Sequence, residues 1–183
     1  KLGDSMCTAL ATPFYLDMGY AKSDIGLVAK NAGLWPAVIG GLLGGLWMVK
    51  LGINRALWLF GLVQFFSIFG FAWLAWLGPN SNIGVVELTS LALVIGFEAL
   101  GVGLGTAAFV AFIARATSPL YTATQFALFT SLAAVPRTFV NATTGVLIEN
   151  FGWFSFFLLC GALAVPGMVL LLKVAPWQQN NNV

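Results

Sequence analysis

The sequence contains no histidine and few charged residues. Charged side chains make up 8% of its 183 residues, against about 25% in soluble globular domains, whereas apolar residues make up 60%. Without histidine the commonest general base and metal ligand is missing, and the acidic residues occur singly. We therefore predict that the chain is not an enzyme and has no catalytic residues, metal site or cofactor. The formal net charge of +2 is carried by scattered residues, which argues against nucleic acid as a partner.

Long apolar runs separated by short polar breaks fill most of the chain. About 20 apolar residues are needed to cross the hydrocarbon core of a bilayer. The pattern predicts an all-α, polytopic membrane protein in a lipid bilayer, with six helices over residues 1–16, 23–49, 56–77, 86–114, 121–148 and 153–174. The first helix is too short for a full span, and it places Asp4 deep in the membrane. We therefore expect the helix to continue on the N-terminal side of Lys1.

Charged residues at the ends of the predicted helices separate by sign. The basic residues Lys50, Arg55, Arg115 and Lys173 fall on one side, and the acidic residues Asp17, Asp24, Glu87 and Glu149 fall on the other, together with Lys22. Because Lys and Arg in short loops are retained on the cytoplasmic side, the basic side is predicted to be cytoplasmic. The C-terminus, including a polar tail over residues 175–183, is predicted to lie on that side.

A short motif recurs 100 residues apart. Residues 45–52 read G-L-W-M-V-K-L-G, and residues 145–152 read G-V-L-I-E-N-F-G, so both have two glycines separated by six residues. Each copy closes the second helix of a predicted three-helix unit. The sequence therefore predicts two repeats, 1–77 and 86–174, which have opposite topology because each contains an odd number of helices.

Four ionisable residues lie inside predicted helices: Asp4, Lys30, Glu98 and Arg137. Glu98 lies roughly 16 Å below the level of Glu87, at 1.5 Å rise per residue, and Arg137 roughly 18 Å below Glu149. Unpaired charges at such depth are costly, so each should face a partner, water or a substrate. One interpretation is that Glu98 and Arg137 neutralise each other.

The other interpretation is a binding site. Thr130, Arg137, Asn141 and Thr144 follow one another at spacings of seven, four and three, which places a polar stripe on one face of a helix. A purely neutralising arginine would not need that stripe. Glycines on the neighbouring predicted helices are interpreted mainly as packing residues.

Three segments carry a resemblance to a known family: K-L-G-D-S-M at 1–6, G-L-G-T-A-A-F-V-A-F at 103–112 and Y-T-A-T-Q-F-A-L at 121–128. Over essentially its whole length the chain resembles AmpG-type anhydromuropeptide permeases of the major facilitator superfamily. The resemblance implies the C-terminal six-helix half of a major facilitator fold, with a missing N-terminal six-helix half, in the bacterial inner membrane. It implies proton-coupled import of GlcNAc-1,6-anhydroMurNAc peptides for peptidoglycan recycling. A transporter of another anionic solute, similar to acetyl-CoA transporters, and a non-transporting membrane scaffold are the alternatives.

The implied muropeptide substrate indicates roles for the polar residues. Its carboxylates are expected to bind the fork of Arg137 and the point charge of Lys30. Its sugar hydroxyls and amides are expected to meet Gln125, Thr130 and Asn141.

Two further roles are expected, the first from the depth of Glu98 in its predicted helix. Glu98, with Asp4 as the reserve candidate, is expected to carry the transported proton. Residues 45–55 resemble the loop signature of the superfamily, which indicates a gating loop with Lys50, Gly52 and Arg55. Val49 stands where that signature usually has aspartate, so the usual gating salt bridge is not expected.

Overall fold

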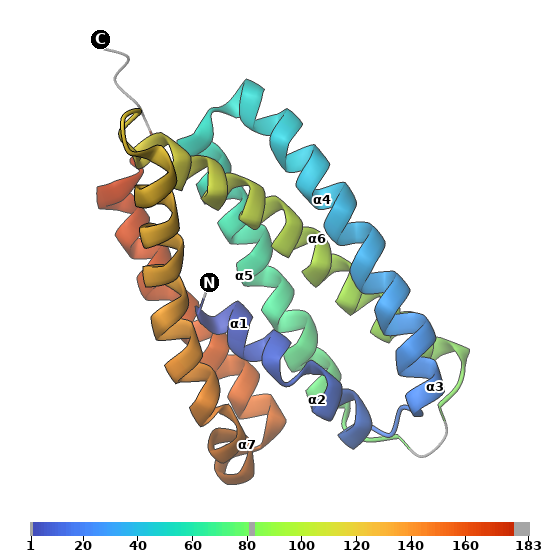
Figure 1. Cartoon of the computed structure of the whole chain (residues 1–183). Coiled ribbons are helices and arrows are strands. Elements are labelled where there is room, and N and C mark those ends of the chain that lie inside the picture. The colour runs from blue at the N-terminus through green and yellow to red at the C-terminus, as the bar shows by residue number, and fades with distance from the viewer. Residues whose placement is uncertain (1, 81–82, 178–183) are drawn as a thin grey trace.

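The described part of the chain is a bundle of helices. The computed structural model describes residues 2–80 and 83–177, and every regular element in those ranges is helical. The elements are α1 (Leu2–Ala9), α2 (Ala11–Asp17), α3 (Lys22–Asp24), the π-helix η1 (Ile25–Ala29), α4 (Lys30–Leu51), α5 (Ile53–Leu77), α6 (Val85–Ala116) and α7 (Thr122–Val174). Figure 1 shows the long helices running beside one another. The predicted all-α class is confirmed for these residues, whereas Lys1 and residues 178–183 of the predicted tail lie outside them.

Four helical stretches are long and apolar enough to cross a membrane: Lys22–Leu51, Ile53–Leu77, Val85–Ala116 and Thr122–Val174. The first three match the predicted helices 23–49, 56–77 and 86–114 within a few residues. The fourth joins the two predicted helices 121–148 and 153–174. The predicted helix over residues 1–16 is divided at Leu10 into the short helices α1 and α2. These stretches support a multi-pass membrane protein, while the count of six helices stays a prediction.

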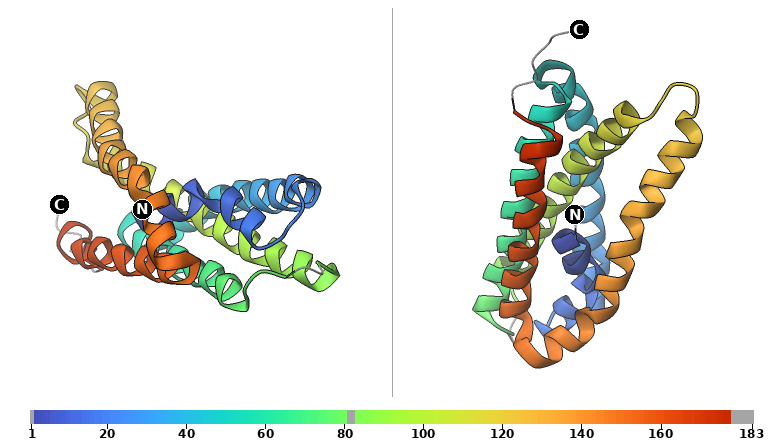
Figure 2. Two further views of the ribbon diagram at one scale, coloured as in Figure 1. Left: turned by 90° about the horizontal axis from the view of Figure 1, so that it is seen from below. Right: turned by 90° about the vertical axis from the view of Figure 1, so that its left-hand side faces the viewer.

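The long helix α7 is interrupted at Gly152. This residue has φ 72° and ψ 168°, outside the helical region, and the orange part of the chain reverses direction in Figure 2. Gly52, between α4 and α5, has the similar values of 79° and 155°. Each is the last glycine of its G-x6-G motif, and each has a positive φ that residues with a Cβ rarely adopt. The motif therefore marks two sharp turns, and the division into the inverted repeats 1–77 and 86–174 stays a prediction.

Glycines let α4 and α6 pack backbone to backbone. A Cβ added at Gly40 would collide with the carbonyl of Leu100, and one added at Gly103 would collide with the carbonyl of Ala37. Glycine allows such an approach because it has no side chain. The interpretation of glycines as packing residues is therefore confirmed at Gly40, and Gly103 plays the same part on α6.

An aromatic cluster holds α2 against α5 and α7. The buried ring of Phe14 lies 4.9 Å from the ring of Phe157 and 5.1 Å from that of Trp153, measured between centroids. The indole Nε1 of Trp153 donates a hydrogen bond of 3.0 Å to Asp17 Oδ2. Since α1 leads directly into α2, fixing α2 in the bundle also places the residues of α1 inside it (Figure 1).

Candidate functional site

Two carboxyl groups meet between α1 and α6. Asp4 on α1 lies close enough to Glu98 on α6 for their side chains to interact directly. The hydroxyl of Thr8, one turn after Asp4, lies 3.4 Å from Glu98 Oε1 and 2.9 Å from the backbone carbonyl of Asp4. The two residues predicted as alternative proton carriers are thus neighbours in space.

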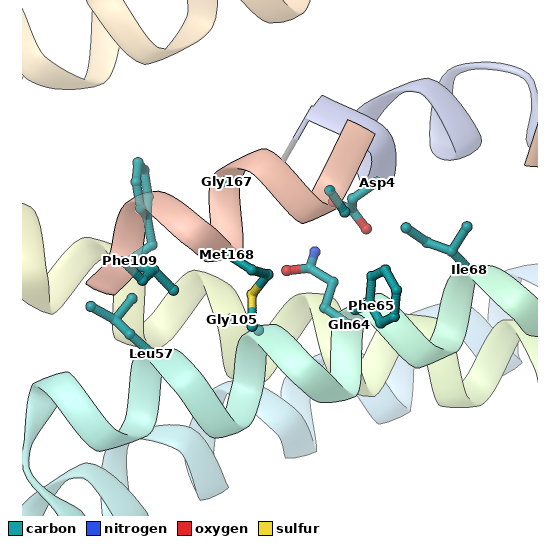
Figure 3. Close-up of a pocket in the computed structure, with 12 residues that line it drawn as sticks. Asp4, Leu57, Gln64, Phe65, Ile68, Gly105, Phe109, Gly167 and Met168 are labelled. Carbon is teal, nitrogen blue, oxygen red and sulfur yellow. The ribbon is translucent and has the colours of Figure 1, made fainter. Parts of the chain in front are cut away.

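A cavity of about 230 Å³ opens beside Asp4. Its walls come from α5, α6 and the second arm of α7, and Figure 3 shows the amide of Gln64 directed into it near Met168 and Asp4. Asp4 Oδ1 and Gln64 Nε2 are buried and have no hydrogen-bond partner among the described residues. A buried polar group normally has a partner, so both atoms are positioned to bind water or another polar group in this cavity.

Two glycines of α6 allow α5 to approach closely at Gln64. A Cβ added at Gly105 would lie 2.7 Å from Gln64 Oε1, and one at Gly101 would lie 3.3 Å from the Cα of Gln64. The hydroxyl of Ser67 donates a hydrogen bond of 2.8 Å to the carbonyl of Gln64. Gly101 and Gly105 lie on α6, the helix that carries Glu98, and they leave the space that the Gln64 amide of α5 occupies.

The uncharged polar residues predicted to bind the substrate, all on α7, make contacts within the protein. Asn141 Nδ2 donates a hydrogen bond of 3.0 Å to Ser5 Oγ on α1. Gln125 Oε1 accepts a hydrogen bond of 2.7 Å from the backbone N–H of Ser118. The hydroxyl of Thr130 donates to the carbonyl of Phe126 at 2.9 Å, within its own helix. Asn141 thus links the stripe to α1, next to the two carboxyl groups.

The predicted cationic residues lie on the surface of the described chain. Arg137 on α7 and Lys30 at the start of α4 are both exposed. The interactions of the Glu98 carboxyl are with Asp4 and Thr8, and Arg137 is not among them. The structure therefore does not bring Glu98 and Arg137 together as a neutralising pair, and the side chain of Arg137 is accessible.

The three residues predicted to form a gating loop lie at the turn between α4 and α5. Lys50 and Arg55 are exposed, and both line a polar pocket of about 310 Å³ together with Gly52. The turn itself is made by the left-handed backbone of Gly52.

Sequence reasoning missed Gln64, Thr8 and Ser5. Thr8 and Ser5 lie in the short first helix, and Gln64 lies in the predicted helix 56–77, for which the charge pattern indicated no site. Gln64 is only 8% exposed. An amide near the middle of an otherwise apolar span was the available signal, because burying it without a partner is costly.

Comparison with known proteins gives several matches, although no family model matches the chain. An uncharacterised protein of Haemophilus influenzae is 53% identical over 182 residues, which are 100% of this chain and 43% of that protein. The anhydromuropeptide permease of Escherichia coli K12 is 39% identical over 173 residues, 94% of this chain and 34% of the permease. The putative transporter AmpG 4 of Rickettsia conorii is 34% identical over 172 residues, 94% of this chain and 40% of that protein. The chain is homologous to the AmpG-type anhydromuropeptide permeases.

This homology confirms the resemblance drawn from the three sequence segments. The chain spans only 34% to 43% of the length of these relatives. Together with the four long apolar stretches, the homology supports a multi-pass membrane protein.

Proposed function

We propose that the chain forms part of a secondary transporter that imports anhydromuropeptides across the bacterial inner membrane together with protons. Homology to an anhydromuropeptide permease over 94% of the chain supports this substrate class. The juxtaposition of Asp4 and Glu98 is the observation that carries the proton coupling. A second, N-terminal half, as the greater length of the relatives indicates, would complete the transport path.

The carboxyl pair is suited to hold one proton. Two carboxylates in one site repel each other, and sharing a proton relieves the repulsion. Thr8 offers a hydroxyl that donates to Glu98 or accepts from its protonated form. Gln64, across the cavity from Asp4, provides a fixed amide for water next to the pair.

Substrate recognition is assigned to the polar face of α7 and to Lys30. Arg137 is exposed and its planar fork matches a carboxylate of the muropeptide peptide. Lys30 provides a second positive charge. Asn141, Thr130 and Gln125 exchange their present contacts for sugar hydroxyls and amides when the substrate binds.

Coupling then follows from charge. An anionic substrate brings negative charge towards Asp4 and Glu98 and favours the proton-bound form of the pair. By linkage, the protonated pair favours binding of the anionic substrate by the same factor. A symporter needs this mutual preference.

Uptake by the full-length protein tests the proposal. A strain without its own muropeptide permease, expressing the native gene, should accumulate a labelled anhydromuropeptide, and an uncoupler should abolish accumulation. An excess of another anionic solute, such as acetyl-CoA, should not compete. Competition by acetyl-CoA would favour the alternative anion transporter.

A membrane scaffold would give a different result from any transporter. With cysteine in place of Arg137, a transporter exposes the thiol to aqueous reagent from each side of the membrane in turn. A scaffold would show no uptake of either solute and would protect the thiol from both sides.

A further inference from the structure

Positive charge is concentrated at one end of the bundle. Four of the eight basic residues of the sequence lie there: Lys50, Arg55, Arg115 and Lys173. The six acidic residues lie elsewhere, with Asp4 and Glu98 in the middle and the rest near the opposite turns. Figures 1 and 2 show the α4–α5 turn, the end of α6 and the end of α7 meeting at this end. The basic end therefore lacks acidic side chains that could neutralise it.

The basic end contains a pocket with firmly positioned walls. Asn54, which is 5% exposed, donates a hydrogen bond of 3.1 Å to the carbonyl of Pro176 and accepts one from Arg115 Nη2. Trp58 Nε1 donates a bond of 3.0 Å to the carbonyl of Ala175. The segment after α7 is thus fastened to the start of α5, and it places Trp177 on the rim of the pocket of about 310 Å³.

Two cations of this pocket are available to a ligand. Lys50 and Arg55 are exposed and line the pocket, and neither forms an ion pair within the described residues. Arg55 lies over the ring of Trp177 at 6.0 Å, which orients its guanidinium group. Arg115 is already engaged with Asn54 and supports the wall instead.

The position of the pocket identifies the kind of ligand. The pocket lies at the turn where the apolar span of α4 ends and that of α5 begins. The ends of membrane-spanning helices lie at the level of the lipid headgroups. Tryptophan is enriched at that level. Val49, also on the pocket wall, is 86% exposed, so an apolar side chain stands beside the cations where an acyl chain would run.

We propose that the pocket formed by Lys50, Asn54, Arg55 and Trp177 binds the phosphate headgroup of an anionic phospholipid. Lys50 and Arg55 bind the phosphate, and Val49 and the exposed apolar face of α4 contact the acyl chain. Basic pockets at helix ends bind anionic headgroups in this way. The site lies apart from Asp4, Glu98 and Arg137, so lipid binding can be measured without a transport assay.

The binding of phosphatidylglycerol to the purified full-length protein in detergent tests this site. Native mass spectrometry measures the affinity, with phosphatidylcholine as the zwitterionic reference. Each cation near a headgroup contributes about fivefold to binding. Lys50→Gln and Arg55→Gln should each weaken phosphatidylglycerol binding about fivefold, and Arg55→Lys should retain most of it.

Lys22→Gln is the matched control, because it removes one exposed charge at the opposite end of the bundle. It should leave phosphatidylglycerol affinity unchanged. Equal losses in Lys22→Gln and Lys50→Gln would overturn the site, since net charge alone would then explain binding. Millimolar inorganic phosphate that displaces the lipid completely would show a site for free anions and would also overturn the proposal.

Discussion

The close contact between α4 and α6 allows a sharp test with two adjacent glycines. A Cβ at Gly40 would collide with the backbone carbonyl of Leu100, whereas a Cβ at Gly41 has nothing within 4 Å. A backbone carbonyl inside a helix cannot turn aside as a flexible side chain does. Gly40→Ala must therefore push the helices apart, and Gly41→Ala adds a methyl group to open space.

The two substitutions should change the free energy of unfolding in opposite directions. Overpacking a tight contact costs about 1–3 kcal/mol. Replacing a helical glycine by alanine gains about 0.5–1 kcal/mol where space allows. Gly40→Ala should therefore lower the free energy of unfolding by about 1–2 kcal/mol, and Gly41→Ala should raise it by up to about 1 kcal/mol.

Unfolding of the full-length protein by sodium dodecyl sulfate in mixed micelles, followed by tryptophan fluorescence, measures this difference. The two variants should be separated by about 1–3 kcal/mol. Equal stability of Gly40→Ala and Gly41→Ala would refute the backbone contact between α4 and α6.

The remaining predictions concern the polar face of α7. Arg137→Lys should reduce muropeptide uptake more than Lys30→Arg, because a point charge replaces a planar fork at the carboxylate; near wild-type uptake by both variants would contradict the assigned roles. Ser5→Ala and Asn141→Ala should each cost about 1 kcal/mol of unfolding free energy, and the double variant little more, because they remove the same hydrogen bond. Additive losses in that double-mutant cycle would argue that the bond does not form.

Local features of the chain were predictable from sequence. Apolar runs gave the ranges of α5 and α6 within a few residues, because the membrane requires long apolar stretches. The polar residues after Gly52 predict a break over residues 53–55, but α5 already begins at Ile53 because the turn needs that glycine alone. The separation of basic residues from acidic residues at opposite ends of the helices could also be predicted, because it depends only on which residues occur in each turn.

Contacts between helices were not predictable in the same way. The pairing of Asp4 with Glu98 depends on the rotation of α1 and α6 about their axes, which the hydrophobic pattern leaves open. Equal depth suggested Arg137 as the partner of Glu98, although the arginine lies on an exposed face. Gln64 joined the site only because two glycines of α6 let α5 approach.

The most direct test of the proposed coupling compares exchange with accumulation in Glu98→Gln, with the full-length protein in proteoliposomes. Glutamine mimics the protonated carboxyl group, so this variant should still bind and exchange labelled anhydromuropeptide across the membrane. It should fail to accumulate the substrate against its gradient when a proton gradient is imposed, and Asp4→Asn should behave in the same way because the pair shares the proton. If Glu98→Gln still accumulates the substrate and an uncoupler abolishes that accumulation, the carboxyl pair is not the coupling site.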